Sequence, residues 1–322
     1  MKAPWVTYRP EIRVLDCTIR DGGLCNNHQF NDELVKAVYL ANVAAGVDYM
    51  EIGYRGSRKL FKAGQDGDWR FCEEDVVRRI VGENPTSMKL AVMADAGKCD
   101  WRNDIQPKDK SVIDLIRVAF YVHQVPEAID MIKHAKDQGY EVSANLMAVS
   151  TVQDPDLDQA LDSLAASPAD VLVVVDSNGA LYAEQIEILV KKYLAAARPS
   201  GKEVGVHTHN NLQLAFANTI EGIIHGANRI DATMSGFGRG AGNCPMELLL
   251  GFLRNPKFKL RPVLELLQHH FVPLRQQLEW GPSVPYNITG QLNQHPRGAM
   301  ALRAGADKDA YAEFYDRCMS DV

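Results

Sequence analysis

The sequence lacks long hydrophobic runs. Its longest apolar stretches, such as VLVVV at 171–175, are far shorter than the roughly 20 residues that a membrane-spanning helix needs. The first residues also lack the apolar centre of a secretory signal peptide. We therefore expect a cytoplasmic protein without a membrane partner.

Basic runs and cysteine motifs are missing as well. The 322 residues contain 35 Lys and Arg against 41 Asp and Glu, which gives a formal net charge of −6. Because nucleic-acid binding usually needs a basic patch, we expect no nucleic-acid partner. The six cysteines form no CxxC pair, which is typical of reduced thiols in a cytosolic protein.

What the sequence does contain is a repeated pattern of a short β-branched run, a polar turn and an amphipathic stretch. Several of the runs are apolar throughout, as in parallel strands that are covered on both faces. Strands that alternate with helices predict a parallel sheet. Eight units without a long linker favour a closed (β/α)₈ TIM barrel over an open doubly wound sheet. The runs occur at 13–18, 47–54, 89–95, 115–120, 141–149, 170–177, 203–209 and 229–236.

The segments between the runs have helical spacing and helix-end signals. One segment starts at Asn31, a helix-capping residue, continues with an acidic first turn and closes at Gly46. Another has Pro126 in its first turn and Gly139 at its end. Both segments are predicted to be helices on the outside of the barrel.

The chain changes character after residue 254. It continues with a helix-like stretch, PVLELLQHHFVPLRQQLEWG, and an irregular stretch that leads into another helix. We therefore predict a TIM-barrel catalytic domain at 1–254. Residues 255–322 are predicted to form a C-terminal helical appendage that covers the barrel.

The sharpest chemical signal is the pair His207 and His209. Active sites of TIM barrels lie at the C-terminal ends of the strands, and this pair ends the seventh run. Because strand side chains alternate between faces, both imidazoles point the same way. Two histidines on one face of a strand end indicate a divalent metal ion.

Asp21 is predicted to complete this metal site. Layers inside the barrel come from alternate strands, so a residue after the first strand can meet the end of the seventh. Asn243, in the glycine-rich stretch GFGRGAGN, offers a fourth ligand. The glycines either bind phosphate or let the backbone approach the metal closely, and we favour close approach. Such a ligand set suits Mn²⁺ or Mg²⁺, with Zn²⁺, Co²⁺ or Fe²⁺ as alternatives.

Arg20 stands next to Asp21 and is predicted to stabilise negative charge that develops on the substrate. Glu51 is expected to orient Arg20, the alternative being that the two residues form only a structural ion pair. Cys25 and Cys244 are candidate nucleophiles near the same C-terminal rim of the predicted barrel, although neither has a basic neighbour in the sequence.

Two motifs, LDCTIRDGG and GVHTHNNLQLAFANTIEGIIHGANRIDATMSGFGRGAGNCPMELLL, resemble those of the DRE-TIM metallolyase superfamily. The resemblance covers roughly residues 12–255 and is strongest to the 4-hydroxy-2-oxovalerate aldolase branch. It implies a lyase that cleaves or forms a C–C bond next to a 2-oxo acid through a metal-bound pyruvate enolate. By this resemblance Asp21, His207 and His209 hold the metal with Asn243 nearby, and Arg20 stabilises the enolate.

The sequence departs from that branch at Leu24, which stands where the family has a histidine for proton transfer. The alternative acids or bases are His28, Tyr286 in PSVPYNITG, and His295. Other polar residues near the strand ends are expected to line the pocket, and those predicted to bind substrate are Arg20, Asp21, Gly22, Asn145, Asp176 and Asn178, with Tyr54, Arg55 and Asp95 beside them.

The resemblance also implies partners. They are a small 2-oxo acid, an aldehyde and an aldehyde dehydrogenase that consumes the aldehyde, with a homo-oligomer as one option. The main alternative function is a Claisen-type condensing enzyme of the isopropylmalate or homocitrate synthase type, which would release free thiol from an acyl-CoA. More remote alternatives are a metal-dependent hydrolase and a non-catalytic metal-binding barrel.

Overall fold

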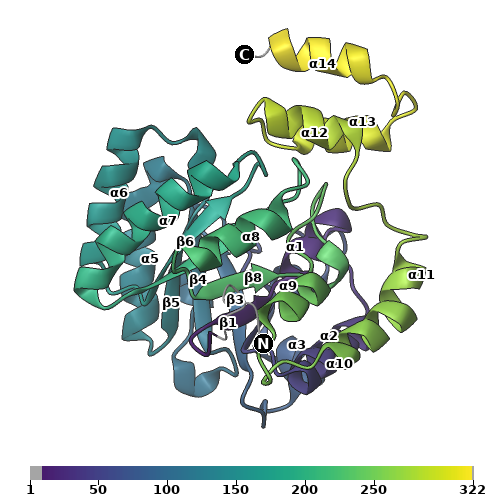
Figure 1. The fold of residues 1–322 in the computed structure, drawn as a ribbon. Helices are drawn as coiled ribbons and strands as arrows, with labels where there is room; N and C mark the ends of the chain where they lie inside the picture. The colour runs from purple at the N-terminus through teal and green to yellow at the C-terminus, as the bar shows by residue number, and fades with distance from the viewer. Residues whose placement is uncertain (1–8, 321–322) are drawn as a thin grey trace, which may run out of the picture.

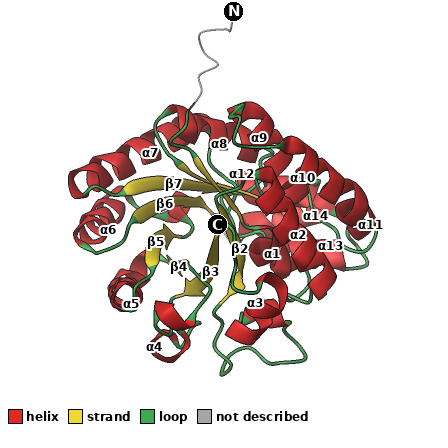
Figure 2. Cartoon of the chain, turned by 90° about the horizontal axis from the view of Figure 1, so that it is seen from below, coloured by secondary structure: helices red, strands yellow, loops and turns green. Residues whose placement is uncertain are grey.

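The protein folds into a closed barrel of eight parallel strands in sequence order. This structure is a computed structural model that describes residues 9–320, so the predicted absence of a signal peptide lies largely outside the described residues. All eight predicted strands are confirmed, and Figure 2 shows their ring from below. They are β1 (Arg13–Asp16), β2 (Tyr49–Tyr54), β3 (Lys89–Asp95), β4 (Leu115–Phe120), β5 (Glu141–Leu146), β6 (Val171–Asp176), β7 (Glu203–Thr208) and β8 (Arg229–Ala232).

Helices surround the strand ring and continue beyond it (Figures 1 and 2). Those of the barrel are α1 (Thr18–Gly22), α2 (Asp32–Ala45), α3 (Glu74–Val81), α4 (Trp101–Asp104), α5 (Val125–Asp137), α6 (Asp154–Ala166), α7 (Ala183–Ala197), α8 (Ala215–Ile224) and α9 (Met246–Leu253). The C-terminal ones are α10 (Leu260–Leu266), α11 (Val272–Leu274), α12 (Val284–Gln291), α13 (Arg297–Ala304) and α14 (Tyr311–Ser320). None of the helices in the described part of the chain is both long and apolar enough to span a membrane.

The predicted helix-end signals act as expected in α2 and α5. The Asn31 side chain accepts a hydrogen bond from the Leu34 amide, with an N···O distance of 2.9 Å. Gly46 ends α2 in the left-handed conformation, with a φ of 76°. Pro126 lies in the first turn of α5, where its missing amide hydrogen costs nothing.

The first strand ends earlier than the run at 13–18 predicts. β1 stops at Asp16, whose carboxylate accepts hydrogen bonds from the amide and the hydroxyl of Thr18. The short helix α1 follows directly with Cys17 as its N-cap, and the Asp21 amide donates to the Cys17 carbonyl at 2.9 Å. Arg20 and Asp21 therefore lie on a helical turn above the strand, where their side chains reach over the barrel opening.

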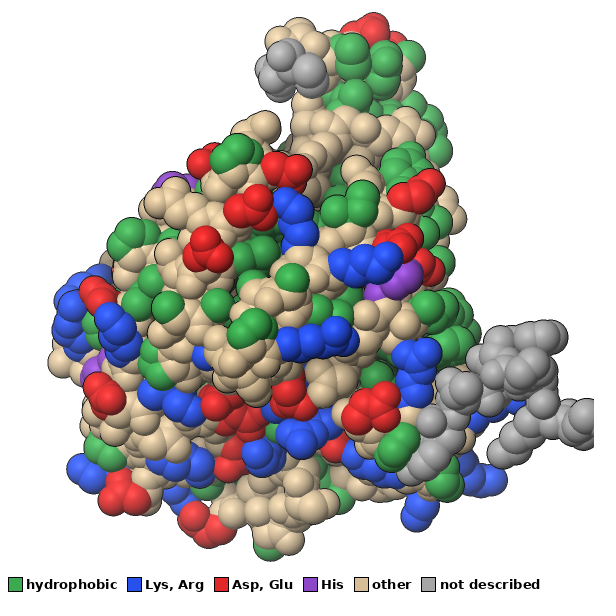
Figure 3. Space-filling view, turned by 60° about the vertical axis from the view of Figure 1, so that its left-hand side comes forward, with side chains coloured by type: hydrophobic (Ala, Val, Ile, Leu, Met, Phe, Trp, Pro, Cys, Tyr) green, Lys and Arg blue, Asp and Glu red, His purple; other side chains and the backbone are tan. Residues whose placement is uncertain are grey.

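The C-terminal segment has two parts. α10 packs against α2 on the outside of the barrel, whereas α12, α13 and α14 form a small separate cluster with a core around Tyr286 and Phe314. Figure 1 shows this cluster beyond the barrel, and Figure 3 shows hydrophobic side chains on it and interspersed charges of both signs on the barrel. The division at 254/255 remains a prediction.

The α12–α14 cluster is attached to the loops that follow β5, β6 and β7. The Asn293 side chain donates to the Ser150 carbonyl at 2.8 Å, and Asn178 donates to the Asn293 carbonyl at 3.0 Å. The Asn287 side chain donates to the Asn211 carbonyl at 2.6 Å. The cluster therefore lies at the end of the barrel where the strands finish, which is the end that carries the predicted site.

Candidate metal centre and active site

The three predicted metal ligands meet at this end of the barrel. The Nε2 atoms of His207 and His209 lie 3.8 Å and 3.6 Å from Oδ2 of Asp21. All three side chains are buried, and one ligand atom of each lies within 4.8 Å of the others. The short helix α1 and the strand β7 thus bring together the carboxylate and the two imidazoles that the sequence pattern combines.

Hydrogen bonds hold both imidazoles in the form that binds a metal. Nδ1 of His209 lies 3.1 Å from the Asp176 carbonyl, which can only accept, so this nitrogen carries the proton. Nδ1 of His207 donates to Oδ2 of Asp231 at 3.0 Å. Nε2 of each ring is buried without a hydrogen-bond partner among the described residues. Two free lone pairs therefore point at Asp21, a known arrangement for metal-binding histidines.

Asn243 adds a further oxygen. Its Nδ2 donates to Oδ1 of Asp21 at 3.1 Å, while its Oδ1 is buried without a partner among residues 9–320. A Cβ atom at Gly238 would lie 2.0 Å from Asn243 Nδ2 and 2.5 Å from Asp21 Oδ1. The glycine-rich stretch therefore approaches the site closely, as we favoured. These unpartnered nitrogen and oxygen atoms fit a divalent cation.

A buried chain of charged groups connects Arg20 to the barrel interior. Arg20 donates from Nη1 to Asp21 and from Nε to Oε2 of Glu51, the latter at 2.7 Å. Glu51 also accepts from Arg117 at 2.9 Å, and Arg117 in turn donates to Asp231. Glu51 and Arg20 therefore form a fully buried ion pair joined by a hydrogen bond. Both the orienting role and the purely structural alternative predict this contact, so the role of Glu51 stays a prediction.

Burial alone would raise the pKa of the Asp21 carboxyl. The charge of Arg20 is the largest opposing contribution, contacts with His209 and His207 add to it, and together they hold this pKa well below its usual value. Burial likewise acts to raise the pKa of Asp231, but Arg117 and the hydrogen bond from His207 keep it below its usual value. Both carboxylates therefore stay ionised, and Asp231 accepts the hydrogen bond from His207 in that form.

A cavity of about 60 Å³ opens beside the metal-binding residues. This volume has room for roughly four to six water molecules, which is comparable to a small 2-oxo acid. The cavity combines a charged side with an apolar side, and the side chains that line it are Arg20, Asp21, Leu24, Tyr54, Met93, Ala119, Asn145, Met147, Val175, Ser177, His207, His209 and Arg239.

Three predicted substrate-binding residues do not line this cavity. Gly22 packs against the ring of Phe237, where a Cβ would come within 2.1 Å of the ring. The Asp176 side chain points out of the barrel and accepts from the amides of Ala180 and Leu181. Asn178 binds the C-terminal segment instead. Asp176 contributes to the site through its backbone carbonyl on His209.

The three alternative acids or bases lie around the cavity and not in its wall. The buried His28 ring packs against Tyr54, with centroids 5.1 Å apart. Burial and the charges of Arg70 and Arg20 lower the pKa of His28 well below its usual value.

His295 and Tyr286 come from the C-terminal segment, as predicted. Nε2 of His295 accepts from Arg239 at 2.8 Å. Burial and the charge of Arg239 lower the pKa of His295 to about 3, so its imidazole is neutral. The Tyr286 ring packs beside Gly240 of the glycine-rich stretch, and burial raises its pKa to about 12.

The cysteines near the rim are poor nucleophiles. Burial raises the pKa of the Cys25 thiol to about 12, and burial raises that of the Cys244 thiol to the same value. Since the thiolate is the reactive form of cysteine, neither residue is activated in this environment.

Sequence reasoning missed Arg117, Asp231 and Arg239. Arg117 and Asp231 occupy inward-facing positions of β4 and β8, where a charged residue interrupts an apolar strand. That interruption at a strand's inward position is the signal that could have found them. Arg239 lies between glycines in GFGRGAGN, and nothing in that pattern tells whether its side chain turns toward the site.

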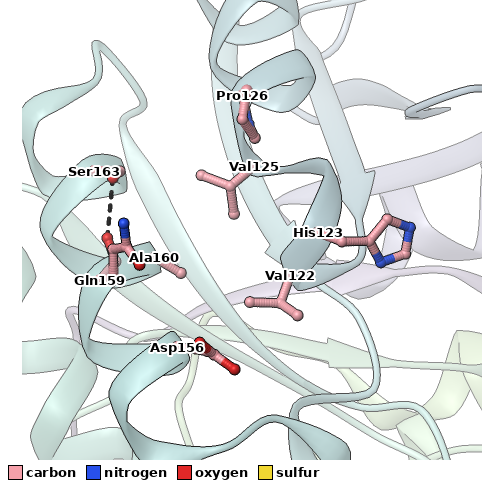
Figure 4. A pocket seen from close by; sticks show the side chains of 8 residues that line it. All are labelled: Val122, His123, Val125, Pro126, Asp156, Gln159, Ala160 and Ser163. Atoms are coloured by element: carbon pink, nitrogen blue, oxygen red, sulfur yellow. Dashed lines mark hydrogen bonds between the residues drawn. The ribbon is translucent and has the colours of Figure 1, made fainter.

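A second hollow, of about 350 Å³, lies outside the barrel between the start of α5 and α6 (Figure 4). His123 points away from the facing side chains of α6 in this view and stacks on Tyr121, with centroids 5.9 Å apart. Among the described residues that line this hollow, Asp156 alone carries a carboxylate. Polar groups do not converge here as they do at the strand ends, so we place the chemistry in the cavity beside His207 and His209.

The fold and the site together define a class of protein, the TIM barrels with a buried two-histidine, one-carboxylate site at the C-terminal ends of the strands. The comparisons specify the family. The family model described as HMGL-like matches residues 116–268. The 4-hydroxy-2-oxovalerate aldolase of Thermus thermophilus is 32% identical over 263 residues, which cover 81% of this chain and 73% of that relative. The chain belongs to the HMGL-like family of aldolases and lyases, the DRE-TIM metallolyases.

Other relatives agree with this assignment. The oxaloacetate decarboxylase of Mycobacterium tuberculosis is 32% identical over 252 residues, covering 77% of this chain and 71% of the relative. The N-terminal domain of a candidate aldolase from Bacteroides vulgatus superposes with a TM-score of 0.77 at 30% identity and covers 94% of this chain and all of that domain. The HMG-CoA lyase of Brucella melitensis, at 16% identity and a TM-score of 0.66, shares the fold.

Proposed function

We propose that the protein is a divalent-metal-dependent aldolase that cleaves a 4-hydroxy-2-oxo acid into pyruvate and an aldehyde, or forms the same bond in reverse. The observation that supports this most is the pair of unpartnered Nε2 atoms on His207 and His209, which face Asp21 beside a small cavity with Arg20 in its wall. The relatives named 4-hydroxy-2-oxovalerate aldolase support the same reaction.

Asp21, His207 and His209 would hold the cation, with the Asn243 oxygen as a further ligand. Mn²⁺ or Mg²⁺ suits the oxygen atoms of this set best, and Zn²⁺ or Co²⁺ are alternatives. When bound, the cation acts as a Lewis acid that stabilises negative charge on the oxygens of a 2-oxo acid.

Arg20 would stabilise the charge that develops when the C3–C4 bond breaks. Its guanidinium is fixed from two sides, by Asp21 and by Glu51, and lines the cavity. A donor that is already oriented need not reorganise during the reaction, which makes its electrostatic contribution large. Glu51 is then a positioning residue for Arg20.

Cleavage must move two protons, because the 4-hydroxyl loses one and carbon C3 gains one. Leu24 cannot serve, although it lines the cavity. We propose Tyr54 as the donor to carbon: it lines the cavity, and burial raises its pKa well above the usual value, so it remains protonated. His28 packs against Tyr54 and would position it. His295 is unsuited to take the hydroxyl proton, because its pKa is about 3 and its Nε2 already accepts from Arg239.

Decarboxylation of oxaloacetate is a second candidate function. It leaves the same three-carbon enolate after loss of CO₂, so Arg20 would act on the same developing charge. The relative from Mycobacterium tuberculosis supports this reaction. An aldehyde dehydrogenase partner and a homo-oligomer remain predictions.

The test is release of pyruvate, followed with lactate dehydrogenase, from 4-hydroxy-2-oxovalerate and separately from oxaloacetate. We expect activity with Mg²⁺ or Mn²⁺, loss after treatment with EDTA, and loss in Asp21→Asn. Arg275→Gln is the matched control, because Arg275 is exposed and outside the cavity wall. Acyl-CoA plus a 2-oxo acid forms a third arm. Release of free thiol there, without pyruvate from either acid, would favour the Claisen-type enzyme and overturn the proposal.

A further inference from the structure

Arg239 differs from the other two arginines around the site in having no carboxylate partner. Arg20 contacts Asp21 and Glu51, and Arg117 contacts Glu51 and Asp231. Among residues 9–320, no carboxylate lies within 4.0 Å of the Arg239 guanidinium, although Arg239 lines the same cavity. A guanidinium beside a largely buried site without a counter-charge is costly unless a ligand supplies that charge.

The position of Arg239 is nevertheless fixed. Nη2 donates to the Ser177 carbonyl at 3.0 Å, and Nη1 donates to Nε2 of His295 at 2.8 Å. Its backbone amide donates to Oδ1 of Asp21 at 3.0 Å, which ties the residue to the metal-binding carboxylate. The Nε atom is buried and has no hydrogen-bond partner in the part of the chain that the structure describes. The guanidinium is thus held in place and retains an unused donor, as expected of a ligand-binding group.

The charges around the cavity indicate which ligand charge the cavity suits. The set made of three guanidinium groups and three carboxylates around the site is neutral by itself; its members are Arg20, Arg117, Arg239, Asp21, Glu51 and Asp231. A bound divalent cation adds two positive charges. A 2-oxo acid with one carboxylate balances only one of them, whereas an acid with two carboxylates balances both.

A second unused donor lies in the same cavity wall. Oδ1 of Asn145 accepts from the Ser143 hydroxyl at 2.7 Å, which fixes the orientation of the amide. Its Nδ2 is buried and has no hydrogen-bond partner within residues 9–320. This amide can donate to another oxygen of a polar substrate, and the cavity of about 60 Å³ requires that the substrate be short.

Building on the proposed function, we propose that Arg239 binds a second carboxylate, so that the substrates are short 4-hydroxy-2-oxo dicarboxylic acids. Cleavage of the five-carbon member then gives pyruvate and glyoxylate, an aldehyde that carries a carboxylate. The 4-hydroxyl loses its proton, the C3–C4 bond breaks, and its electron pair goes to C3, which takes up a proton. The step needs no oxidant, reductant or further reactant.

Two matched pairs of five-carbon acids test this proposal. 4-Hydroxy-2-oxoglutarate and 4-hydroxy-2-oxovalerate differ only in a terminal carboxylate against a methyl group, and their kcat/KM values are compared. 2-Oxoglutarate and 2-oxovalerate form the same contrast without a hydroxyl to cleave, and their dissociation constants from the Mg²⁺-loaded protein are measured by calorimetry. The proteins are the wild type, Arg239→Gln, Arg239→Lys and the control Arg275→Gln.

We expect the wild type to favour the dicarboxylic member of each pair by about 10- to 100-fold, the range for a hydrogen bond between charged groups. Arg239→Gln should remove the preference by raising KM and the dissociation constant for the dicarboxylate alone. Arg239→Lys should restore part of it, and Arg275→Gln should change neither value. A purely structural role for Arg239 would affect both members of each pair equally.

The proposal would be overturned if the wild type had equal kcat/KM values and equal dissociation constants for the two members of each pair. It would also be overturned if Arg239→Gln weakened both members equally, or if the wild type bound neither 2-oxoglutarate nor 2-oxovalerate. Cleavage of 4-hydroxy-2-oxovalerate in such a case would leave the proposed function intact. Conversely, a binding preference that depends on Arg239, without cleavage of any hydroxy acid, would support the carboxylate site and contradict the aldolase.

Discussion

The two ends of the barrel use charged residues in opposite ways. At the end where the strands begin, Arg229 donates to Glu203 at 2.7 Å and also contacts Glu141. Glu141 further accepts from the Tyr49 hydroxyl at 3.0 Å and from Lys89 at 2.8 Å. None of these side chains has a buried polar atom without a partner among the described residues, and the cavity there is only about 20 Å³.

At the end where the strands finish, polar atoms remain without partners. Buried polar atoms in proteins are normally satisfied, so such a concentration points to a ligand. In TIM barrels one end serves stability and the other function, and here hydrogen bonding distinguishes the two. Among the described residues, the unpartnered atoms in or beside the candidate metal site include Nε2 of His207 and His209, Oδ1 of Asn243, Oε1 of Glu51, Nδ2 of Asn145 and Nε of Arg239.

The substitution Asp21→Asn, at the end where the strands finish, is expected to have the largest effect on activity. We expect activity to fall by about 10³-fold, because the charge stabilisation supplied by the cation is worth several kcal/mol. Affinity for Mn²⁺, measured by calorimetry, should fall at least about 100-fold. The far-ultraviolet circular dichroism spectrum should not change. Undiminished Mn²⁺ affinity would remove Asp21 from the metal site.

Arg20→Gln should give the next largest effect. We expect kcat to fall by about 10²- to 10³-fold, the usual loss when one oriented donor to a developing oxyanion is removed. Mn²⁺ affinity should stay within a few-fold of the wild-type value, because Arg20 is not a ligand. A loss of metal binding as large as that of activity would assign Arg20 a structural role only.

Asp231→Asn tests the orientation of His207. The side-chain amide introduced at this position is neutral and is a weaker acceptor for Nδ1–H of His207 than the carboxylate. We therefore expect metal affinity to fall by about 10- to 100-fold. Asp231→Glu should restore part of the affinity if the carboxylate still reaches the ring. Equal affinities in the wild type and Asp231→Asn would show that the His207 tautomer does not depend on this hydrogen bond.

Arg229→Gln examines the other end of the barrel. It leaves Glu141 and Glu203 less well paired, and we expect the free energy of unfolding to fall by about 2–4 kcal/mol, less than for a fully buried pair because Glu203 is partly exposed. Urea titration measures this change. The kcat of the folded fraction should equal that of the wild type, and a selective loss of kcat would contradict the division between the two ends.

The smallest effect is expected from thiol modification. With thiol pKa values of about 12 for Cys25 and Cys244, iodoacetamide at pH 8 should leave activity unchanged within an hour, because almost no thiolate is present. Mass spectrometry checks the extent of labelling. Rapid inactivation that follows the labelling of Cys25 would return this residue to the list of candidate nucleophiles.

The strands and the cluster of Asp21, His207 and His209 could be predicted from the sequence because each depends on local pattern. Apolar runs of strand length recur between capped helices, and the spacing of His207 and His209 places both rings on one face of β7. The position of Asp21 beside the two histidines was predicted because Asp21 follows the first strand-like run. These inferences need only chain periodicity and the rule that places active sites at the strand ends.

The remainder of the site depends on contacts between distant segments. The direction of the Arg239 side chain is set by the Ser177 carbonyl and by His295, which lie 62 and 56 positions away. The placement of Gly22 against Phe237 likewise follows from packing between distant segments. Local contacts that the pattern does not show decide two further features: Asp176 accepts from the Ala180 and Leu181 amides, and Asp16, where β1 ends, accepts from the amide and hydroxyl of Thr18.

Our central claim is that the side chains with unpartnered polar atoms at the strand ends, together with a divalent cation, stabilise the enolate of pyruvate. The most direct measurement is proton NMR of pyruvate in D₂O with the purified protein and Mg²⁺, run beside Asp21→Asn. We predict loss of the methyl signal that depends on Mg²⁺ and is absent in the variant. A methyl signal that persists with the wild-type protein at saturating Mg²⁺ would contradict the claim.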